Sequence, residues 1–113
     1  MNSTCTHKNR VRPRRGKLEC FSNLPFCAQT KFKILAKEVK EIDSSIEDVY
    51  VFGSWFWGVW DKDSDYDIRI NTGSFPYSQK EFRSYVFDKY QFPADIMILR
   101  PPKKDKKLIK IPV

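Results

Sequence analysis

Residues 50–70, YVFGSWFWGVWDKDSDYDIRI, constrain the fold more than any other part of the chain. Just before and within this stretch, Val49–Phe52 is β-branched or aromatic throughout, which predicts a short buried strand. Further along, Asp65–Ile70 alternates polar and apolar residues with a period of two, which predicts a second strand. Alternate side chains of a strand point to the same face, so Asp65 and Asp67 should lie side by side.

The turn after the first strand has the composition of an anion site. Gly53 and Ser54 lead into a short expected helix, and glycine lets a ligand approach the unpaired amides of the first turn. The two carboxylates downstream repel each other unless a cation lies between them, and oxygen ligands of this kind suit magnesium. Together these features favour phosphoryl or nucleotidyl transfer. The alternative is an acidic loop beside a buried strand.

The spacing of these residues adds a family resemblance. The chain carries, in order and separated by three and then six residues, Gly53-Ser54, Gly58 and Asp65-x-Asp67-Ile68. This pattern resembles the signature of the DNA polymerase beta-like nucleotidyltransferase superfamily, and most closely its minimal nucleotidyltransferase branch. The resemblance covers about residues 30–99. It implies an α+β fold with a small mixed β-sheet and helices packed on one face.

The resemblance also implies roles for the residues of the pattern. Gly53, Ser54 and Gly58 would hold the nucleotide. Asp65 and Asp67 would hold two Mg²⁺ (or Mn²⁺) ions.

A third carboxylate is expected on a later strand. Asp95 is the polar residue of the otherwise apolar strand predicted over Ala94–Leu99. By the same resemblance it would complete the metal and catalytic site. A carboxylate in so apolar a strand needs a partner. That partner is either the metal or an Arg or Lys side chain.

One position departs from the family pattern. Many members carry Arg just before the second glycine, where this chain has Trp57 within Trp55-Phe56-Trp57. The indole of Trp57 could stack on the nucleotide base, or it could be a core residue. Packing is expected to account for only one or two of the four large aromatics of this segment, the fourth being Trp60.

The whole chain, at 113 residues, is expected to form one small domain. We predict a basic N-terminal arm and linker over residues 1–28, a nucleotidyltransferase domain over 29–100 and a basic tail over 101–113. No apolar run is long enough to cross a bilayer and no signal peptide is recognised, so a cytoplasmic protein without a membrane partner is expected.

Charge is unevenly distributed along the chain. Residues 1–20 carry six Lys or Arg against one acid, and residues 100–113 also carry six against one, so each end is +5. The total of +7 leaves −3 for the middle. Basic ends beside an acidic centre fit a polyphosphate or nucleic-acid substrate. The alternative is that the ends are disordered, solubilising tails.

Four potential zinc ligands near the N-terminus, Cys5, His7, Cys20 and Cys27, leave a second metal site as an alternative. Their spacing matches none of the common zinc-finger patterns. The alternative is that these are ordinary residues without a metal, the cysteines buried and His7 exposed. The odd number of cysteines argues against a disulfide framework.

The remaining elements are two helices and an edge strand. Thr30 is predicted to cap a helix that runs to about Ile42, and Ser78 with Glu81 forms a capping box for a helix that ends near Tyr90. Residues 108–111 are predicted to form an edge strand. Relatives of this kind continue into a further helix, so we expect the N-terminal segment, a partner protein or a second copy to cover the sheet.

The resulting hypothesis is a magnesium-dependent nucleotidyltransferase that transfers a nucleoside monophosphate from a nucleoside triphosphate to an acceptor hydroxyl. A small free-standing domain resembles enzymes that attach AMP to a partner protein, so this subclass is preferred over transfer to an RNA or DNA end. The alternative is a catalytically inactive nucleotidyltransferase-like module that binds nucleic acid or a protein partner in a larger assembly.

Overall fold

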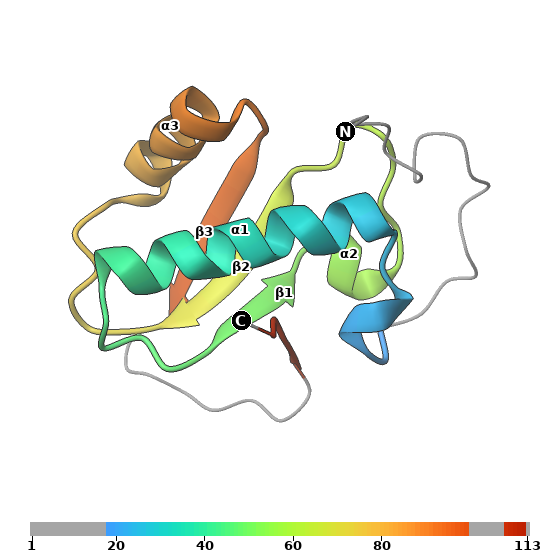
Figure 1. The fold of residues 1–113 in the computed structure, drawn as a ribbon, viewed down its shortest axis with the longest axis horizontal. Coiled ribbons are helices and arrows are strands. Elements are labelled where there is room, and N and C mark those ends of the chain that lie inside the picture. Colours follow the sequence, from blue (N-terminus) through green and yellow to red (C-terminus); the bar gives the residue numbers. More distant parts are fainter. Residues whose placement is uncertain (1–17, 100–107, 113) are drawn as a thin grey trace.

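A four-stranded mixed sheet forms the centre of the computed structural model, which describes residues 18–99 and 108–112 (Figure 1). The strand order is β3-β2-β1-β4. β1 is antiparallel to β2 and β4, whereas β2 and β3 are parallel. The strands are β1 (Val49–Phe52), β2 (Tyr66–Asn71), β3 (Ala94–Leu99) and β4 (Ile109–Lys110). The predicted α+β class with a small mixed sheet is thereby confirmed.

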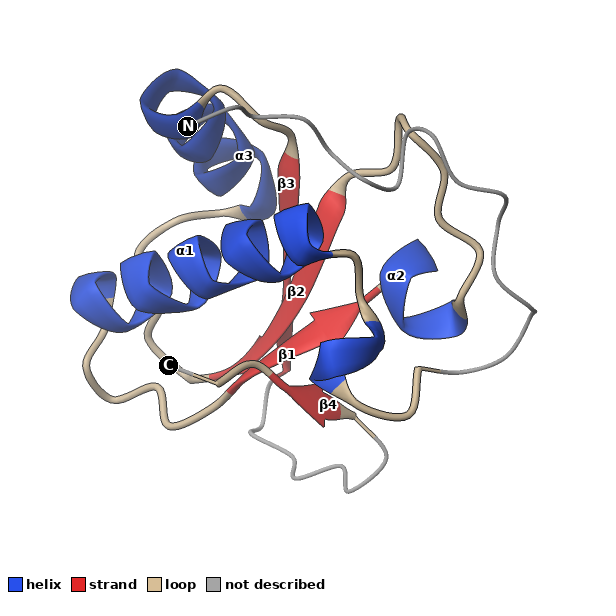
Figure 2. Ribbon diagram, turned by 45° about the vertical axis from the view of Figure 1, so that its right-hand side comes forward, coloured by secondary structure: helices blue, strands red, loops and turns tan. Residues whose placement is uncertain are grey.

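Two long helices, α1 (Phe26–Ile42) and α3 (Gln79–Tyr90), pack on one face of this sheet (Figures 1 and 2). The alternation of β2 explains why: Ile68 and Ile70 are fully buried, whereas the residues between them are only partly buried. Apolar side chains on one face of the sheet require a covering layer, and the apolar stripes of the helices provide it. The third helix, α2 (Ser54–Trp57), is a single turn at the end of β1.

The start of α1 differs from the prediction. The helix begins at Phe26, directly after Pro25, so Thr30 lies inside it and its Oγ1 donates to the carbonyl oxygen of Phe26 at 3.2 Å. Proline is favoured at a helix start, where its missing N–H removes no hydrogen bond. The predicted cap at Thr30 was therefore wrong. For α3, the capping box of Ser78 and Glu81 is confirmed.

A buried carboxylate joins the two long helices. Glu38 of α1 is only 4% exposed. Its carboxylate accepts hydrogen bonds from the hydroxyls of Tyr85 and Tyr90 and forms an ion pair with Lys89, and all three partners lie on α3. Burial raises the pKa of Glu38, but these three partners outweigh burial and leave the pKa below its usual value. This joint between Glu38 and α3 holds α3 against α1 and so helps to position the side chains that α3 directs toward the sheet.

The core also includes residues outside the predicted domain of residues 29–100. Leu18 and Leu24 are buried, the amide of Leu18 donates to the carbonyl of Phe56 at 2.6 Å, and Ile111 is buried beside β1. The predicted boundaries themselves remain a prediction. Most of the two basic ends lies outside the described residues. No helix among those described is long and apolar enough to cross a membrane.

Candidate metal and nucleotide site

Three carboxylates converge where β1 ends and the parallel strands β2 and β3 begin. Asp67 of β2 is in register with Asp95 of β3, and Asp65 immediately precedes β2. One oxygen from each of the three lies within 4.8 Å of the others. Within residues 18–99 and 108–112, this is the only group of three or more potential metal ligands. The structure thus brings together the three residues that the sequence predicted as the metal site.

Asp67 lies in an environment that disfavours its negative charge. Its Oδ1 is buried and has no hydrogen-bond partner among the described residues. Burial, followed by the charges of Asp95 and Asp65, raises its pKa to about 7, against the opposing effect of Arg83. A buried, unpaired carboxylate oxygen is costly. Hard, closely spaced oxygen ligands of this kind fit Mg²⁺ or Mn²⁺, so the residues present suit the metal that the sequence implied.

Gly53 is held against this carboxylate. Its backbone has φ +70°, a conformation that favours glycine, and a Cβ at this position would lie 2.0 Å from Oδ2 of Asp67. Any side chain at position 53 would therefore collide with the carboxylate. The predicted Gly-Ser turn and the predicted metal ligand Asp67 are therefore in direct contact.

The rest of the predicted turn forms α2 and its end. The amides of Phe56 and Trp57 donate to the carbonyl of Gly53 at 3.0 and 3.2 Å. Gly58 has φ +72° and ends the helix in the left-handed conformation, where glycine is the usual residue. Gly58 thus has a structural role in the fold, and its predicted contact with a nucleotide remains a prediction, as does that of Ser54.

The aromatic residues of this segment are more buried than predicted. Trp55, Phe56 and Trp60 are all in the core, whereas packing was expected to explain only one or two of the four. Trp55 stacks between Trp60 and Tyr66, with ring centroids 5.1 Å apart in each case. Its Nε1 donates to the carbonyl oxygen of Asp65 at 2.8 Å. The buried indole therefore fixes the backbone of a predicted metal ligand, and this role was missed from the sequence.

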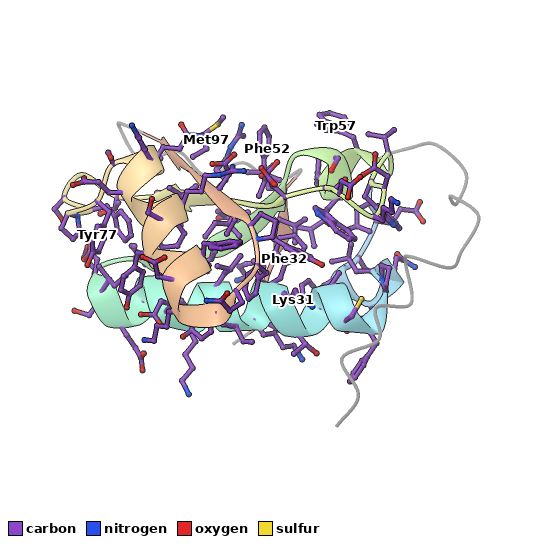
Figure 3. The ribbon with its side chains drawn as sticks, turned by 90° about the horizontal axis from the view of Figure 1, so that it is seen from above. Lys31, Phe32, Phe52, Trp57, Tyr77 and Met97 are labelled. Carbon is purple, nitrogen blue, oxygen red and sulfur yellow. The ribbon has the colours of Figure 1, made fainter. Side chains whose placement is uncertain are left out.

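Trp57 differs from its three aromatic neighbours because it is 52% exposed. It contacts the ring of Phe56 edge-on, with centroids 4.9 Å apart. Figure 3 shows it on the side of the molecule away from α1, together with Phe52 and Met97. The interpretation of Trp57 as a core residue is therefore wrong. Its predicted stacking on a base remains a prediction.

Arg83 is a site residue that sequence reasoning missed. Its Nη1 lies 2.7 Å from Oδ2 of Asp65 and 3.2 Å from Oδ2 of Asp95. One helical turn earlier, Nε2 of Gln79 lies 3.4 Å from Oδ1 of Asp95. The basic partner that the sequence left open for Asp95 is thus Arg83 in this structure. No pattern in the sequence distinguishes it from the other basic residues of α3, because its role depends on where the helix packs.

The face of the sheet opposite α1 and α3 carries a second group that the sequence did not suggest. The guanidinium of Arg69, on β2, lies over the ring of Phe52 at 3.8 Å, and its Nη2 lies 3.3 Å from the sulfur of Met97. Arg69 shares this face with Asp67, two residues earlier. A basic and partly apolar surface therefore adjoins the carboxylates.

The alternative zinc site gains no support from the part of the chain that is described. Cys5 and His7 lie outside the described residues. Cys20 is exposed and contacts Ser22 and Asn23, and Cys27 lies in the first turn of α1. Among the described residues, neither cysteine belongs to a group of potential metal ligands.

One comparison with known proteins gives a match. The family model described as "Nucleotidyltransferase domain" matches residues 32–112, well over half of the chain. The match includes β1, the Gly-Ser turn, all three carboxylates and both ends of α3. No curated protein and no solved structure matches the chain at a significant level.

Proposed function

We propose a reaction for the site of this chain, which belongs to the nucleotidyltransferase domain family. The protein transfers a nucleoside monophosphate from a nucleoside triphosphate to an acceptor hydroxyl and depends on Mg²⁺ or Mn²⁺. The observation that carries this proposal is the convergence of Asp65, Asp67 and Asp95 within 4.8 Å, with one buried oxygen of Asp67 lacking a hydrogen-bond partner.

In this proposal each carboxylate has a defined task. Asp65 and Asp67 would hold the divalent ions, and Asp95 would complete the ligand set and receive the proton of the attacking hydroxyl. When bound, the ions supply positive charge to the phosphates and to the attacking and leaving oxygens. The acceptor oxygen forms a bond to the α-phosphorus, the bond to the bridging oxygen breaks, and pyrophosphate leaves.

The turn supplies the binding groups of the proposal. Gly53 and Ser54 hold the phosphates, with Gly58 ending the turn, and the exposed ring of Trp57 receives the base. Gly53 is suited to close approach because it has no side chain and already packs against Asp67. Base stacking on an exposed aromatic ring needs no particular base, so Trp57 would bind different nucleotides similarly.

For the acceptor, we propose a hydroxyl of a partner protein, with AMP as the transferred group. The sheet face opposite α1 and α3, where Arg69 lies over Phe52 beside Asp67, offers a basic and apolar surface for such a partner. A nucleic-acid end is the second candidate acceptor, supported by the two basic ends of the sequence. The two acceptors differ in the salt dependence of binding, which is steep when phosphates are contacted.

The test is labelling of acceptors in a cell lysate. We expect label from α-phosphate-labelled triphosphates, but not from γ-labelled ones, to enter protein in the presence of Mg²⁺. Asp67→Asn should abolish this label. Asp63→Asn, which removes an exposed carboxylate from the loop that precedes β2, should leave it unchanged. Label from the γ-position, or transfer that survives Asp67→Asn, would contradict the proposal; label in nucleic acid would change the acceptor.

A catalytically inactive module is the second candidate function, and the position of Arg83 is the observation that favours it. A guanidinium paired with Asp65 and Asp95 partly satisfies the carboxylates without a metal. In that case the purified protein would bind its partner with equal affinity after Asp67→Asn, and labelling would be absent in the wild type.

A further inference from the structure

Arg83 forms accessible ion pairs with the carboxylates of the proposed site. Its guanidinium reaches two of the three carboxylates at 2.7 and 3.2 Å, and its side chain is 45% exposed. Each of the two carboxylates is 28% exposed. Ion pairs as accessible as these contribute little stability, so the guanidinium can leave them at low cost. Arg83 therefore offsets part of the negative charge of the site without being held there tightly.

Charge balance sets what happens when a divalent ion arrives. When all three carboxylates are ionised, as metal binding requires, they carry a net charge of −2 together with Arg83, and one divalent ion balances that charge. The ion and the guanidinium then compete, because both bind the oxygens of Asp65 and Asp95. Their positive charges also repel each other at this separation, so both cannot stay. An arginine side chain keeps its positive charge in proteins, so Arg83 cannot give up these oxygens by losing a proton. It must yield by moving.

The phosphates of a bound triphosphate would offer a new ligand to a displaced Arg83. The Gly53–Gly58 turn, GSWFWG, contains no basic residue. Among the described residues, Arg83 is the only basic side chain with a hydrogen bond or ion pair to the three carboxylates. Guanidinium groups bind phosphate oxygens in a paired geometry that suits a polyphosphate. The joint of Glu38 with Tyr85 and Lys89 holds α3 in place, so only the Arg83 side chain needs to swing.

We propose that the Arg83 side chain exchanges one set of binding partners for another when a metal ion binds. It pairs with Asp65 and Asp95 when no metal is bound, and it binds the phosphates of the nucleoside triphosphate once a divalent ion has taken the carboxylates. This inference rests on the proposed function. It adds a residue from α3 to a site otherwise built from β1, β2, β3 and the Gly-Ser turn.

The inference makes Arg83→Gln change two affinities in opposite directions. Binding of Mn²⁺ alone, measured by titration calorimetry, should become about tenfold tighter because the competing guanidinium is gone. Binding of inorganic tripolyphosphate to the Mn²⁺-saturated protein should become about tenfold weaker. Tripolyphosphate is chosen because it contains no base and cannot donate a nucleotide.

Lys80→Gln provides the matched control. Lys80 lies on the same helix, is exposed, and its loss changes the net charge by the same amount. Neither affinity should change more than twofold in this variant. Thermal melting of both variants shows whether they are folded.

The outcomes separate cleanly. Weaker binding of both ligands in Arg83→Gln would indicate a structural role and overturn the proposal. Tighter Mn²⁺ binding with unchanged tripolyphosphate affinity would also overturn it, because Arg83 would then only block the site. If Mn²⁺ binding to the wild type is insensitive to Asp67→Asn, the proposed function itself fails, and this is distinguishable from a failure at Arg83.

Discussion

The two faces of the sheet differ sharply although the same strands build both. Along β2, Ile68 and Ile70 point toward α1 and α3 and are fully buried. The residues between and beside them, Asp67 and Arg69, point to the face opposite these helices and are only partly buried. One strand therefore provides stability on one side and candidate chemistry on the other. The comparison teaches that the partly buried polar groups on the face opposite the helices lower stability, and that the apolar packing beneath the helices must offset this cost.

The largest expected effect comes from the covered face. Ile68→Ala should lower the free energy of unfolding by about 2–5 kcal/mol, because it leaves a cavity beneath both helices. Urea denaturation at equilibrium measures this. Ile68→Val, with an expected loss of about 0.5–1.5 kcal/mol, keeps the test usable if the alanine variant does not fold. A loss below 0.5 kcal/mol for alanine would contradict the division between the faces.

The second-largest effect is expected at Asp67, on the face of the sheet opposite the helices, where the charged carboxylate lowers the stability of the metal-free protein. Its pKa of about 7 in the fold lies above the usual 3.8, so the folded protein holds a proton that the unfolded chain has released. Stability of the metal-free protein should fall as pH rises from about 4 to about 7 and then level off. The upper limit of this loss is about 4 kcal/mol, from 1.36 kcal/mol per pKa unit.

Three measurements test this pH dependence. Asp67→Asn should remove this part of the pH dependence and make the metal-free protein more stable at pH 8, whereas Asp63→Asn should change neither. Added Mn²⁺ should stabilise the wild type at pH 8 but not Asp67→Asn. A wild-type unfolding free energy that rises between pH 4 and pH 7 would show that other groups dominate.

An intermediate effect is expected between the helices of the covered face. Glu38→Gln removes a buried charge that three donors of α3 share, and should cost about 1–3 kcal/mol. Glu41→Gln, on an exposed position of the same helix, should change stability by less than 0.5 kcal/mol. Equal unfolding midpoints for the two variants would mean that α3 is held by its apolar side chains alone.

The smallest effect on stability is expected at Trp57. Because the indole is 52% exposed, Trp57→Ala should change the unfolding free energy by less than about 0.5 kcal/mol. Affinity for a nucleoside triphosphate should nevertheless fall about tenfold, with all four bases affected alike. Val59→Ala removes another exposed apolar side chain nearby and should leave that affinity unchanged. Unaltered affinity in Trp57→Ala would remove the stacking interpretation.

Patterns local to a strand allowed much of this arrangement to be predicted from the sequence. β1 and β3 have the predicted bounds, and the alternation after Asp65 placed Asp65 and Asp67 together. Period-two alternation determines which face a side chain occupies without reference to the rest of the fold. The family resemblance supplied Asp95, because the parallel pairing of β2 with β3 cannot be deduced from local pattern alone.

What could not be predicted depends on packing between distant segments. The contact of Arg83 with Asp65 requires the position of α3 relative to the sheet, which Glu38 on α1 helps to set. The burial of Trp55 between two other rings likewise follows from tertiary contacts. At α1, a plausible cap at Thr30 competed with Pro25, and proline determined the start of the helix.

The contact between Gly53 and Asp67 makes the two positions epistatic. Any side chain at position 53 meets the carboxylate at 2.0 Å, so alanine there should be far more harmful in the wild type than in an Asp67→Gly background. The strained backbone at φ +70° would remain as the residual cost. A lineage that lost the carboxylate would thus lose much of the selection on this glycine, and regaining the carboxylate would first require the glycine to return. The order of mutations, and not their number alone, would then decide whether such a site can be rebuilt.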